Sequence, residues 1–187
     1  MGTVVRIVAG VAGGRRLAVP LHGTRPTSDR VREAVFSALQ ARRDLSGARV
    51  LDLYAGSGAL GLEALSRGAA HVRFVESDRR AATVLHRNVE AMGLPGAQVT
   101  TGTVQAVLRG DPGESYDVVL ADPPYALDEV ALAGVLSALA GGGWLARSAL
   151  LAVERPVKAL PPTWPDDVAA LMHRRYGDTA VHYGCAP

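Results

Sequence analysis

The stretch Leu51-Asp52-Leu53-Tyr54-Ala55-Gly56-Ser57-Gly58-Ala59-Leu60-Gly61 decides the fold of this chain. Its apolar beginning predicts a buried strand, its glycines predict a tight turn, and residues 60–68 have the pattern of a helix that Gly68 ends. The glycines match G-x-G-x-x-G in the strand–turn–helix context in which that pattern binds a nucleotide. A tight turn explains each glycine taken alone, so the prediction depends on the residues after the helix.

An acidic residue occurs at the distance that a nucleoside site requires. The next apolar run, 71–75, predicts a second strand, and it ends at Glu76, twenty residues after Gly56. At that separation an acidic side chain reaches the ribose diol of a nucleotide bound at the glycine turn. The strand, turn, helix, strand and acid together favour a nucleoside-cofactor site over a set of unrelated turns.

The charge of Asp52 bears on which nucleoside binds. Dehydrogenases that bind a dinucleotide use the same strand–turn–helix geometry. In such an enzyme the Asp52 carboxylate would face a pyrophosphate and repel it, whereas it could accept hydrogen bonds from an ammonium group. S-adenosylmethionine, a nucleoside that carries an amino acid, is therefore the cofactor that we predict.

A second motif, Ala121-Asp122-Pro123-Pro124-Tyr125, comes after the apolar run 116–120, which predicts another buried strand. That strand cannot continue through the two prolines, because neither has an N–H to donate. Asp122 is therefore expected at the carboxyl end of a strand, the edge at which open α/β sheets bind ligands. A carboxylate, a carbonyl and an aromatic ring within four residues suit a flat ring that bears an amino group. A rigid turn with a surface aspartate and a packing tyrosine is the alternative.

The remaining strands and helices alternate along the chain. Such alternation predicts an α/β, Rossmann-like fold with a mostly parallel sheet and right-handed crossovers. The side chains of Asp52, Glu76, Thr103 and Asp122 would then lie along one edge of the sheet. The further predicted elements are helices at 79–92 and 128–140, strands at 98–101 and 149–154, and a closing hairpin within 168–183.

The first 43 residues predict a small extension of this domain. Residues 4–10 and 15–20 predict a β-hairpin with a glycine-rich turn. A helix capped by Thr27 or Ser28 should come next and run to about Gln40. Its apolar face contains Val31, Val35, Phe36 and Leu39, and we expect Arg30 and Arg32 on the opposite, exposed face.

The charge of the chain is concentrated in this extension. Residues 1–43 contain eight arginines and only two acidic side chains, Asp29 and Glu33. Residues 44–187 contain more acidic than basic side chains. A basic segment on a mildly acidic body favours a polyanionic partner such as a nucleic acid. An amphipathic helix with a solvated face explains the spacing equally well.

Composition excludes several classes of protein. With 187 residues, 48% of them hydrophobic, the chain can bury one core. No apolar run approaches the ~20 residues of a membrane helix, and glycines interrupt any signal-like stretch at the N-terminus. Cys185 is the only cysteine, which excludes an internal disulfide and a multi-cysteine zinc site. We expect a cytoplasmic, monomeric protein without a metal ion or membrane contact.

Taken together, these motifs resemble those of the bacterial RsmD-type 16S ribosomal RNA (guanine-N2)-methyltransferases, a family of class I S-adenosylmethionine-dependent enzymes. The resemblance covers nearly the whole chain, and its most specific part is Arg25-Pro26-Thr27-Ser28-Asp29-Arg30-Val31-Arg32-Glu33. It implies a seven-stranded sheet with helices on both faces, an antiparallel hairpin at one edge, and methylation of one guanine in small-subunit (16S) ribosomal RNA. The other matching stretches are Arg6–Gly10, Leu51–Arg67, Asp122–Tyr125 and Gly143–Ala146.

The predicted site residues form three sets. The catalytic set is Asp122, Pro123, Pro124 and Tyr125. The cofactor-binding set is Asp52, Tyr54, Ala55, Gly56, Ser57, Gly58, Gly61, Glu76, Ser77, Gly102, Thr103 and Asp122. The RNA-binding set is Arg6, Arg15, Arg16, Arg25, Thr27, Arg30 and Arg32.

Two positions depart from the family pattern. Thr103 stands where the family more often has Asp or Asn beside the adenine. Residues 126–129, after the Asp-Pro-Pro-Tyr motif, are acidic rather than basic, which argues against an RNA contact at that point.

We therefore predict an RNA-contacting extension, residues 1–43, and a methyltransferase domain, residues 44–187, that act on 16S ribosomal RNA in a small-subunit particle or an assembly intermediate. Three alternatives remain. A methyltransferase of DNA adenine or cytosine usually adds a target-recognition domain, for which 187 residues leave no room. A protein-glutamine methyltransferase more often has Asn in place of Asp122. A non-catalytic RNA-binding assembly factor would lose the glycine turn or Asp122, and both are intact.

Overall fold

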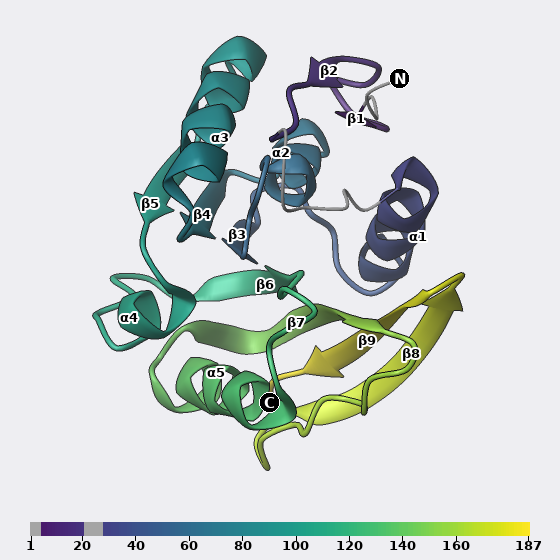
Figure 1. The fold of residues 1–187 in the computed structure, drawn as a ribbon, viewed down its shortest axis with the longest axis vertical. Coiled ribbons are helices and arrows are strands. Elements are labelled where there is room, and N and C mark those ends of the chain that lie inside the picture. Colours follow the sequence, from purple (N-terminus) through teal and green to yellow (C-terminus); the bar gives the residue numbers. More distant parts are fainter. Residues whose placement is uncertain (1–4, 21–27) are drawn as a thin grey trace.

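Seven strands form one central sheet in the computed structural model, which describes residues 5–20 and 28–187 (Figure 1). The strand order is β5-β4-β3-β6-β7-β9-β8, and only β9 runs against the other six. The predicted mostly parallel sheet and the closing antiparallel hairpin, β8–β9, are confirmed. The strands are β3 (Arg49–Leu53), β4 (His71–Glu76), β5 (Ala97–Thr101), β6 (Tyr116–Ala121), β7 (Leu145–Pro156), β8 (Ala169–Tyr176) and β9 (Thr179–Cys185).

Helices cover both faces of the sheet, as predicted. Successive strand residues point to opposite faces, so Val50 lies in one hydrophobic cluster and the adjacent Leu51 in the other. The first cluster includes residues of α1 (Asp29–Gln40), α2 (Ala59–Ser66) and α3 (Arg79–Met92). The second includes residues of α4 (Val104–Leu108) and α5 (Glu129–Gly141). None of the helices within the two described ranges is long and apolar enough to cross a bilayer.

Polar side chains fix where the helices begin. The Ser28 hydroxyl accepts a hydrogen bond from the Val31 N–H, which confirms one of the two caps predicted for α1. The Asp78 and Asp128 carboxylates cap α3 and α5 in the same way. The Thr103 hydroxyl caps α4, a helix that the sequence did not predict because five residues are too few for a helical period.

The N-terminal hairpin is confirmed, although its paired strands, β1 (Val5–Arg6) and β2 (Arg16–Leu17), are only two residues long. It does not fold apart from the sheet, because the apolar side chains of β1 and β2 belong to the same hydrophobic cluster as α1, α2 and α3. Figure 1 shows the hairpin lying above α2, beside α1 and α3. The extension therefore lies directly against the helix that comes after the glycine turn.

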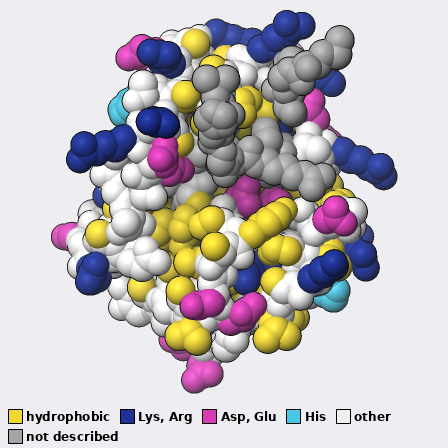
Figure 2. Space-filling view, viewed as in Figure 1, with side chains coloured by type: hydrophobic (Ala, Val, Ile, Leu, Met, Phe, Trp, Pro, Cys, Tyr) yellow, Lys and Arg dark blue, Asp and Glu magenta, His cyan; other side chains and the backbone are white. Residues whose placement is uncertain are grey.

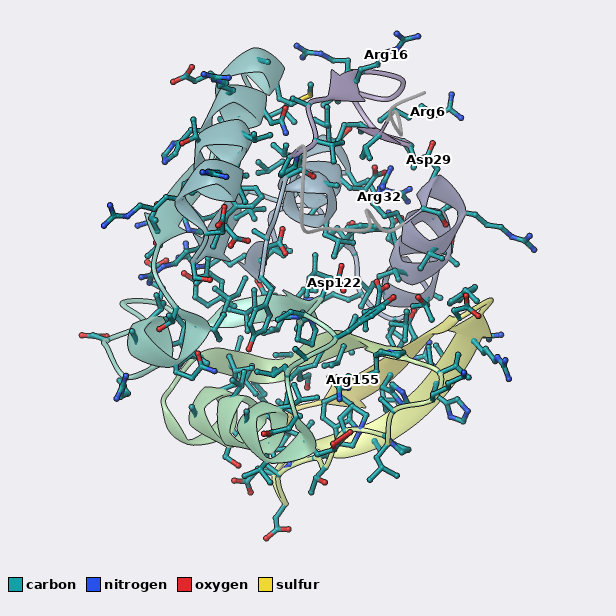
Figure 3. The ribbon with its side chains drawn as sticks, in the orientation of Figure 1. Arg6, Arg16, Asp29, Arg32, Asp122 and Arg155 are labelled. Atoms are coloured by element: carbon teal, nitrogen blue, oxygen red, sulfur yellow. The ribbon has the colours of Figure 1, made fainter. Side chains whose placement is uncertain are left out.

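The expected exposure of Arg32 is wrong. Its side chain is fully buried, and its guanidinium donates to the Arg6 carbonyl at 2.5 Å and to the Asp29 carboxylate at 2.6 Å. Figure 3 shows Arg6, Asp29 and Arg32 gathered where the hairpin meets α1. The helical period in fact places Arg32 on the same side of the helix as Phe36 and Leu39, four and seven residues later, and the hairpin covers that side. Arg32 therefore joins two parts of the extension and is not available as a surface contact.

Candidate active site

The two motifs meet at the point where the strand order reverses. The chain passes from β3 outward to β4 and β5, then returns to place β6 on the other side of β3. Leu53 pairs with Ala121, so β3 and β6 end side by side. The glycine turn and the Asp-Pro-Pro-Tyr segment both begin at this paired end. Ligands of open α/β sheets bind at such a switch point.

Asp122 is held where β6 stops. Its N–H donates to the Leu53 carbonyl at 3.4 Å, which continues the β3–β6 ladder by one residue. The chain then turns, and the Leu127 N–H donates to the Pro124 carbonyl at 2.8 Å. Pro123 is buried, whereas 57% of the Tyr125 side chain is exposed. The motif thus forms a fixed elbow that presents an aromatic ring to solvent, as predicted.

The glycine turn has two kinds of glycine. A Cβ at Gly58 would lie 2.3 Å from Leu85 Cδ1, and a Cβ at Gly61 would lie 2.3 Å from Phe74 Cε1. Both positions are therefore filled by the protein core. A Cβ at Gly56 would meet no atom closer than 4.0 Å, and its φ of +56° is one that glycine adopts readily. Gly56 is the glycine of the motif that leaves room for a ligand.

Tyr54, at the start of the turn, has an unusual backbone. Its φ is +60°, which is uncommon for a residue with a side chain. Its buried hydroxyl has no hydrogen-bond partner among the described residues, and burial raises the pKa of Tyr54 to about 12. Unsatisfied polar atoms and rare backbone angles concentrate at ligand sites, which agrees with a cofactor position at this turn.

Asp52 is 1% exposed, and one carboxylate oxygen accepts a hydrogen bond from the Gly61 N–H at 2.9 Å. One N–H at the start of α2 is thus already bonded within the protein. Burial, opposed by this hydrogen bond and reinforced by the charge of Glu76, raises the pKa of Asp52 to about 7. An ammonium group beside this buried carboxyl group would stabilise its charged form, which fits the predicted role of Asp52.

Asp52 should make stability fall with pH. Its pKa is 3.8 in an ordinary setting and about 7 in the folded chain. The folded protein therefore keeps a proton that the unfolded chain loses, so the stabilising contribution is complete below about pH 4 and is lost as the pH rises through about 7. Asp52→Asn should gain stability over the unmodified protein by up to about 1.4 kcal/mol per pH unit across this window. Urea unfolding from pH 4 to 8 measures the difference, with Asp111→Asn, an exposed site, as the control. Parallel stability curves for Asp52→Asn and the unmodified protein would contradict the predicted titration.

Glu76 closes the other side of the turn. One of its carboxylate oxygens accepts from the Gly56 N–H at 2.7 Å, and the other accepts from the Asp78 N–H at 2.7 Å. Each oxygen has a second lone pair, so the carboxylate can also accept from a ribose diol. Glu76 therefore lies beside Gly56 at the turn, and its predicted contact with a ribose diol stays a prediction.

The predicted residues beyond β4 and β5 also lie on this edge. Ser77 comes directly after β4, and the Gly102 N–H donates to the Glu76 carbonyl at 2.9 Å. The Thr103 hydroxyl accepts from the Ala106 N–H at 3.2 Å, so it is occupied as a helix cap. Asp and Asn are also favoured helix caps, so either residue could cap α4 in the same way.

One site-supporting residue was missed from the sequence. Arg155, at the end of β7, is 3% exposed, and its guanidinium donates to the Leu127 carbonyl at 3.0 Å and to the Glu129 carboxylate at 3.1 Å. Figure 3 shows Arg155 below Asp122 in the middle of the molecule. Arg155 thus fixes the chain just after the elbow. The acidic segment 126–129 pairs with this arginine and caps α5, which accounts for its charge.

The RNA-binding set is spread over different environments. Arg16 and Arg30 are exposed, and Arg6 is exposed while its guanidinium pairs with Asp29 at 2.8 Å. The Arg15 guanidinium donates to the Met92 carbonyl at 2.8 Å and to the Ala91 carbonyl, so it ties the hairpin to the end of α3. Arg25 and Thr27 lie outside the described residues. On the face of the molecule that Figure 2 shows, Lys and Arg side chains project around the rim, and acidic and hydrophobic side chains lie toward the middle.

Within the described ranges, no group of three or more His, Cys, Asp or Glu side chains is placed to hold a metal ion.

Comparison with known proteins agrees with this geometry. The family model described as conserved hypothetical protein 95 matches residues 5–184. The chain belongs to this family. Ribosomal RNA small subunit methyltransferase D of Escherichia coli K12 is 40% identical over 162 residues, which cover 86% of this chain and 79% of that protein. The protein of the same name from Haemophilus influenzae is 34% identical over 177 residues, covering 92% and 89%.

A solved structure matches over almost the full length. The Escherichia coli protein yhhF, described as a candidate methyltransferase, superposes with a TM-score of 0.87 at 34% identity and covers 98% of both chains. The predicted RsmD-type family is therefore confirmed. The same relatives confirm the fold and the methyltransferase class, and structural neighbours described as S-adenosylmethionine-dependent or bound to S-adenosylhomocysteine support the predicted cofactor. The individual roles of the site residues stay predictions.

Proposed function

We propose that this protein transfers a methyl group from S-adenosylmethionine to the exocyclic N2 amine of a guanine in 16S ribosomal RNA. The observation that carries this proposal is the meeting of two motifs, a cofactor turn and an Asp-Pro-Pro-Tyr elbow, at the ends of β3 and β6. The relatives named as small-subunit ribosomal RNA methyltransferases support ribosomal RNA as the substrate. S-adenosylmethionine, when bound, supplies an electrophilic methyl group.

The residues around the turn fit the cofactor. The Gly56 backbone borders open space, the Glu76 carboxylate can accept from the ribose diol, and the Asp52 carboxylate can accept from the ammonium group. The charges match as well, because two carboxylates face a ligand that carries a net positive charge on its ammonium and sulfonium groups.

The elbow can increase the nucleophilicity of the guanine amine, which is weak because the lone pair of the nitrogen is delocalised into the ring. The Asp122 carboxylate and the Pro123 carbonyl each accept one of the two N–H bonds. The nitrogen then becomes more tetrahedral, and its lone pair turns away from the ring. Tyr125 stacks on the base and fixes its plane. In this scheme the Asp122 carboxylate accepts the proton that the nitrogen loses after it gains the methyl group, and S-adenosylhomocysteine leaves as the neutral thioether.

Positioning supplies much of the rate enhancement in this scheme. Holding two reactants in line can lower the barrier by about 7–11 kcal/mol. The target base must first leave any stack that it occupies, which costs a few kcal/mol. The exposed Tyr125 ring is suited to recover part of this cost, because it offers a flat surface to an unstacked base.

The exposed arginines of the extension are the proposed RNA contacts. Arg16 on the hairpin and Arg30 on α1 are exposed, and Arg6 pairs with Asp29 where the hairpin meets α1 (Figure 3). Arg32 supports this surface from within, because its buried guanidinium holds the Arg6 carbonyl and Asp29. The proposed RNA surface is therefore built from the hairpin and α1, and both pack with α2, the helix that comes after the cofactor turn.

Neutralising two of these arginines should weaken the salt dependence of RNA binding. Each phosphate contact contributes a slope of about 0.7–0.9 to the fall of log K with log salt concentration, so Arg16→Gln/Arg30→Gln should flatten the slope by that amount per lost contact. Filter binding of 16S ribosomal RNA across a series of KCl concentrations measures the effect. Arg109→Gln/Arg147→Gln, an equal change of charge at sites outside the extension, is the matched control. Equal slopes for the two double variants would contradict the proposal that Arg16 and Arg30 contact RNA phosphates.

A methylation assay tests the function itself. The protein is incubated with labelled S-adenosylmethionine and with small-subunit particles, naked 16S ribosomal RNA or duplex DNA, each from a methylation-deficient source. Label is expected in N2-methylguanosine at one position of the ribosomal RNA. Label in adenine or cytosine, in DNA, or in a protein glutamine would overturn the assignment in favour of one of the alternatives.

The substrate form and the cellular setting complete the proposal. We propose that the enzyme acts as a monomer in the cytoplasm, on a small-subunit particle or an assembly intermediate. The two-part organisation, with residues 1–43 contacting RNA and residues 44–187 carrying out methyl transfer, supports recognition of folded RNA around the target. Higher activity on particles than on naked RNA in the same assay is the expected result.

A further inference from the structure

A buried asparagine connects the N-terminal hairpin to the cofactor turn. Asn88, on α3, is 3% exposed. Its amide oxygen accepts from the Ala18 N–H at 2.9 Å, and its amide nitrogen donates to the Ala18 carbonyl at 2.9 Å. The same nitrogen donates to the Ser57 carbonyl at 2.8 Å. One side chain thus holds the strand that leaves the hairpin and the middle of the glycine turn at the same time.

Asparagine suits this position because the three partners need both a donor and an acceptor. The Asn amide has two N–H donors for two carbonyls and an oxygen acceptor for one N–H. An aspartate could accept from the Ala18 N–H, but its oxygens would face the Ala18 and Ser57 carbonyls without a proton to share. A leucine would leave the buried Ser57 carbonyl and the partly buried Ala18 N–H and carbonyl without this partner.

The surrounding contacts make the connection stiff. Leu85, about one helical turn before Asn88 on α3, fills the space where a Cβ of Gly58 would lie. The glycine turn therefore contacts α3 at two consecutive residues, Ser57 and Gly58. A shift of α3 or of the Asn88 amide would move the turn, because interiors at this packing density transmit small displacements.

The other end of the hairpin is tied to the helix that comes after the turn. The Glu63 carboxylate, on α2 and fully buried, accepts from the Val8 N–H at 2.7 Å and the Ala9 N–H at 3.0 Å. Arg67 balances this charge at 2.8 Å. Both chain segments of the hairpin are thus hydrogen-bonded to the two helices that enclose the cofactor turn.

We infer that Asn88 is a positioning residue that couples RNA binding on the hairpin to cofactor binding at the glycine turn. RNA that orders the hairpin holds Ala18 against Asn88, and Asn88 holds the Ser57 carbonyl in the orientation that the cofactor site requires. By linkage, bound cofactor raises the affinity for RNA by the same factor. The coupling rests on the proposed RNA contact of the extension, whereas the support of Ser57 by Asn88 does not.

The test measures the affinity for S-adenosylhomocysteine by calorimetry, with and without a saturating 16S ribosomal RNA transcript. In the unmodified protein RNA should tighten binding by about five- to tenfold, at the lower end of typical coupling factors. Asn88→Ala and the near-isosteric Asn88→Asp should weaken binding about tenfold without RNA, and RNA should then no longer tighten it. Val89→Ala, a neighbouring loss of packing on α3, is the matched control and should keep the coupling factor.

The outcomes separate the inference from the proposed function. A coupling factor that is unchanged in both Asn88 variants would show that Asn88 has a structural role only and would overturn the inference. A coupling factor of one in the unmodified protein, with RNA still bound in a salt-dependent manner, would also overturn it and leave the RNA substrate intact. An absence of RNA binding in a direct filter assay would instead overturn the proposed function. Weaker cofactor binding in the Asn88 variants without RNA would still support the positioning of Ser57.

Discussion

Asp122→Ala should abolish methyl transfer while it leaves the affinity for S-adenosylmethionine nearly unchanged. In the proposed mechanism the carboxylate accepts from the guanine amine and orients it, and removing one such preorganised polar group from an active site lowers kcat by about 10²- to 10³-fold. The proposed cofactor contacts come from β3 and β4, at the turn and the Glu76 carboxylate, and the substitution leaves these residues in place. Single-turnover transfer of labelled methyl groups and calorimetry with S-adenosylhomocysteine measure the two effects separately.

The control for Asp122 is another carboxylate of the same segment. The Asp128 carboxylate caps α5 by accepting from the Ala131 N–H at 2.7 Å, six residues after Asp122. Asp128→Ala should cost about 1 kcal/mol of stability and retain methyl transfer. A variant of Asp122 that loses cofactor affinity and keeps a normal rate at saturating cofactor would assign Asp122 to the cofactor site alone.

Gly10→Ala should detach the N-terminal hairpin from α2. Gly10 has a φ of +82°, and a Cβ there would lie 1.9 Å from the Ser66 carbonyl oxygen. That oxygen belongs to the backbone and accepts from the Val11 N–H at 2.8 Å, so neither side can give way. We expect a loss of about 3 kcal/mol or more, since an unfavourable φ and a backbone clash act together. Thermal unfolding should show the loss, and RNA affinity should fall with it.

Gly14→Ala separates the cost of the unfavourable φ from the cost of the backbone clash. Gly14 lies in the same turn with a φ of +84°, but a Cβ there would meet no atom within 4 Å. This variant should cost only the left-handed backbone penalty, about 1–2 kcal/mol, and should keep RNA affinity. Equal losses in the two variants would mean that the Ser66 contact does not hold the hairpin.

Local patterns account for the features that could be predicted from the sequence. The glycine turn, the proline elbow and the acid at position 76 are each defined by residues within about twenty positions, and the structure places all three at the β3–β6 switch point and its neighbour β4. The direct contact between Gly56 and Glu76 agrees with the separation of those two residues. The small helix α4 escaped prediction because its length gives no period.

The other errors and omissions concern polar side chains with distant partners. Arg32 was expected on the exposed face of its helix, but it lies among the buried residues of that helix and donates to the Arg6 carbonyl, 26 residues earlier. Asn88 bonds Ala18 across 70 residues, and Arg155 bonds Leu127 across 28. The period of a helix or strand indicates which of its side chains are apolar. It does not indicate which distant segment will supply a hydrogen-bond partner to a polar side chain.

The sequence by itself determined the fold class, the cofactor turn and the acceptor elbow, because each depends on backbone preferences and side-chain spacing over a short range. The tertiary structure alone decided how the basic extension connects to the catalytic domain. Glu63 and Asn88 are ordinary helical residues in the sequence, and only the folded hairpin brings the Val8 N–H and the Ala18 carbonyl to their buried side chains. The buried hydrogen bonds of a folded chain are set by which segments meet, and no local pattern contains that information.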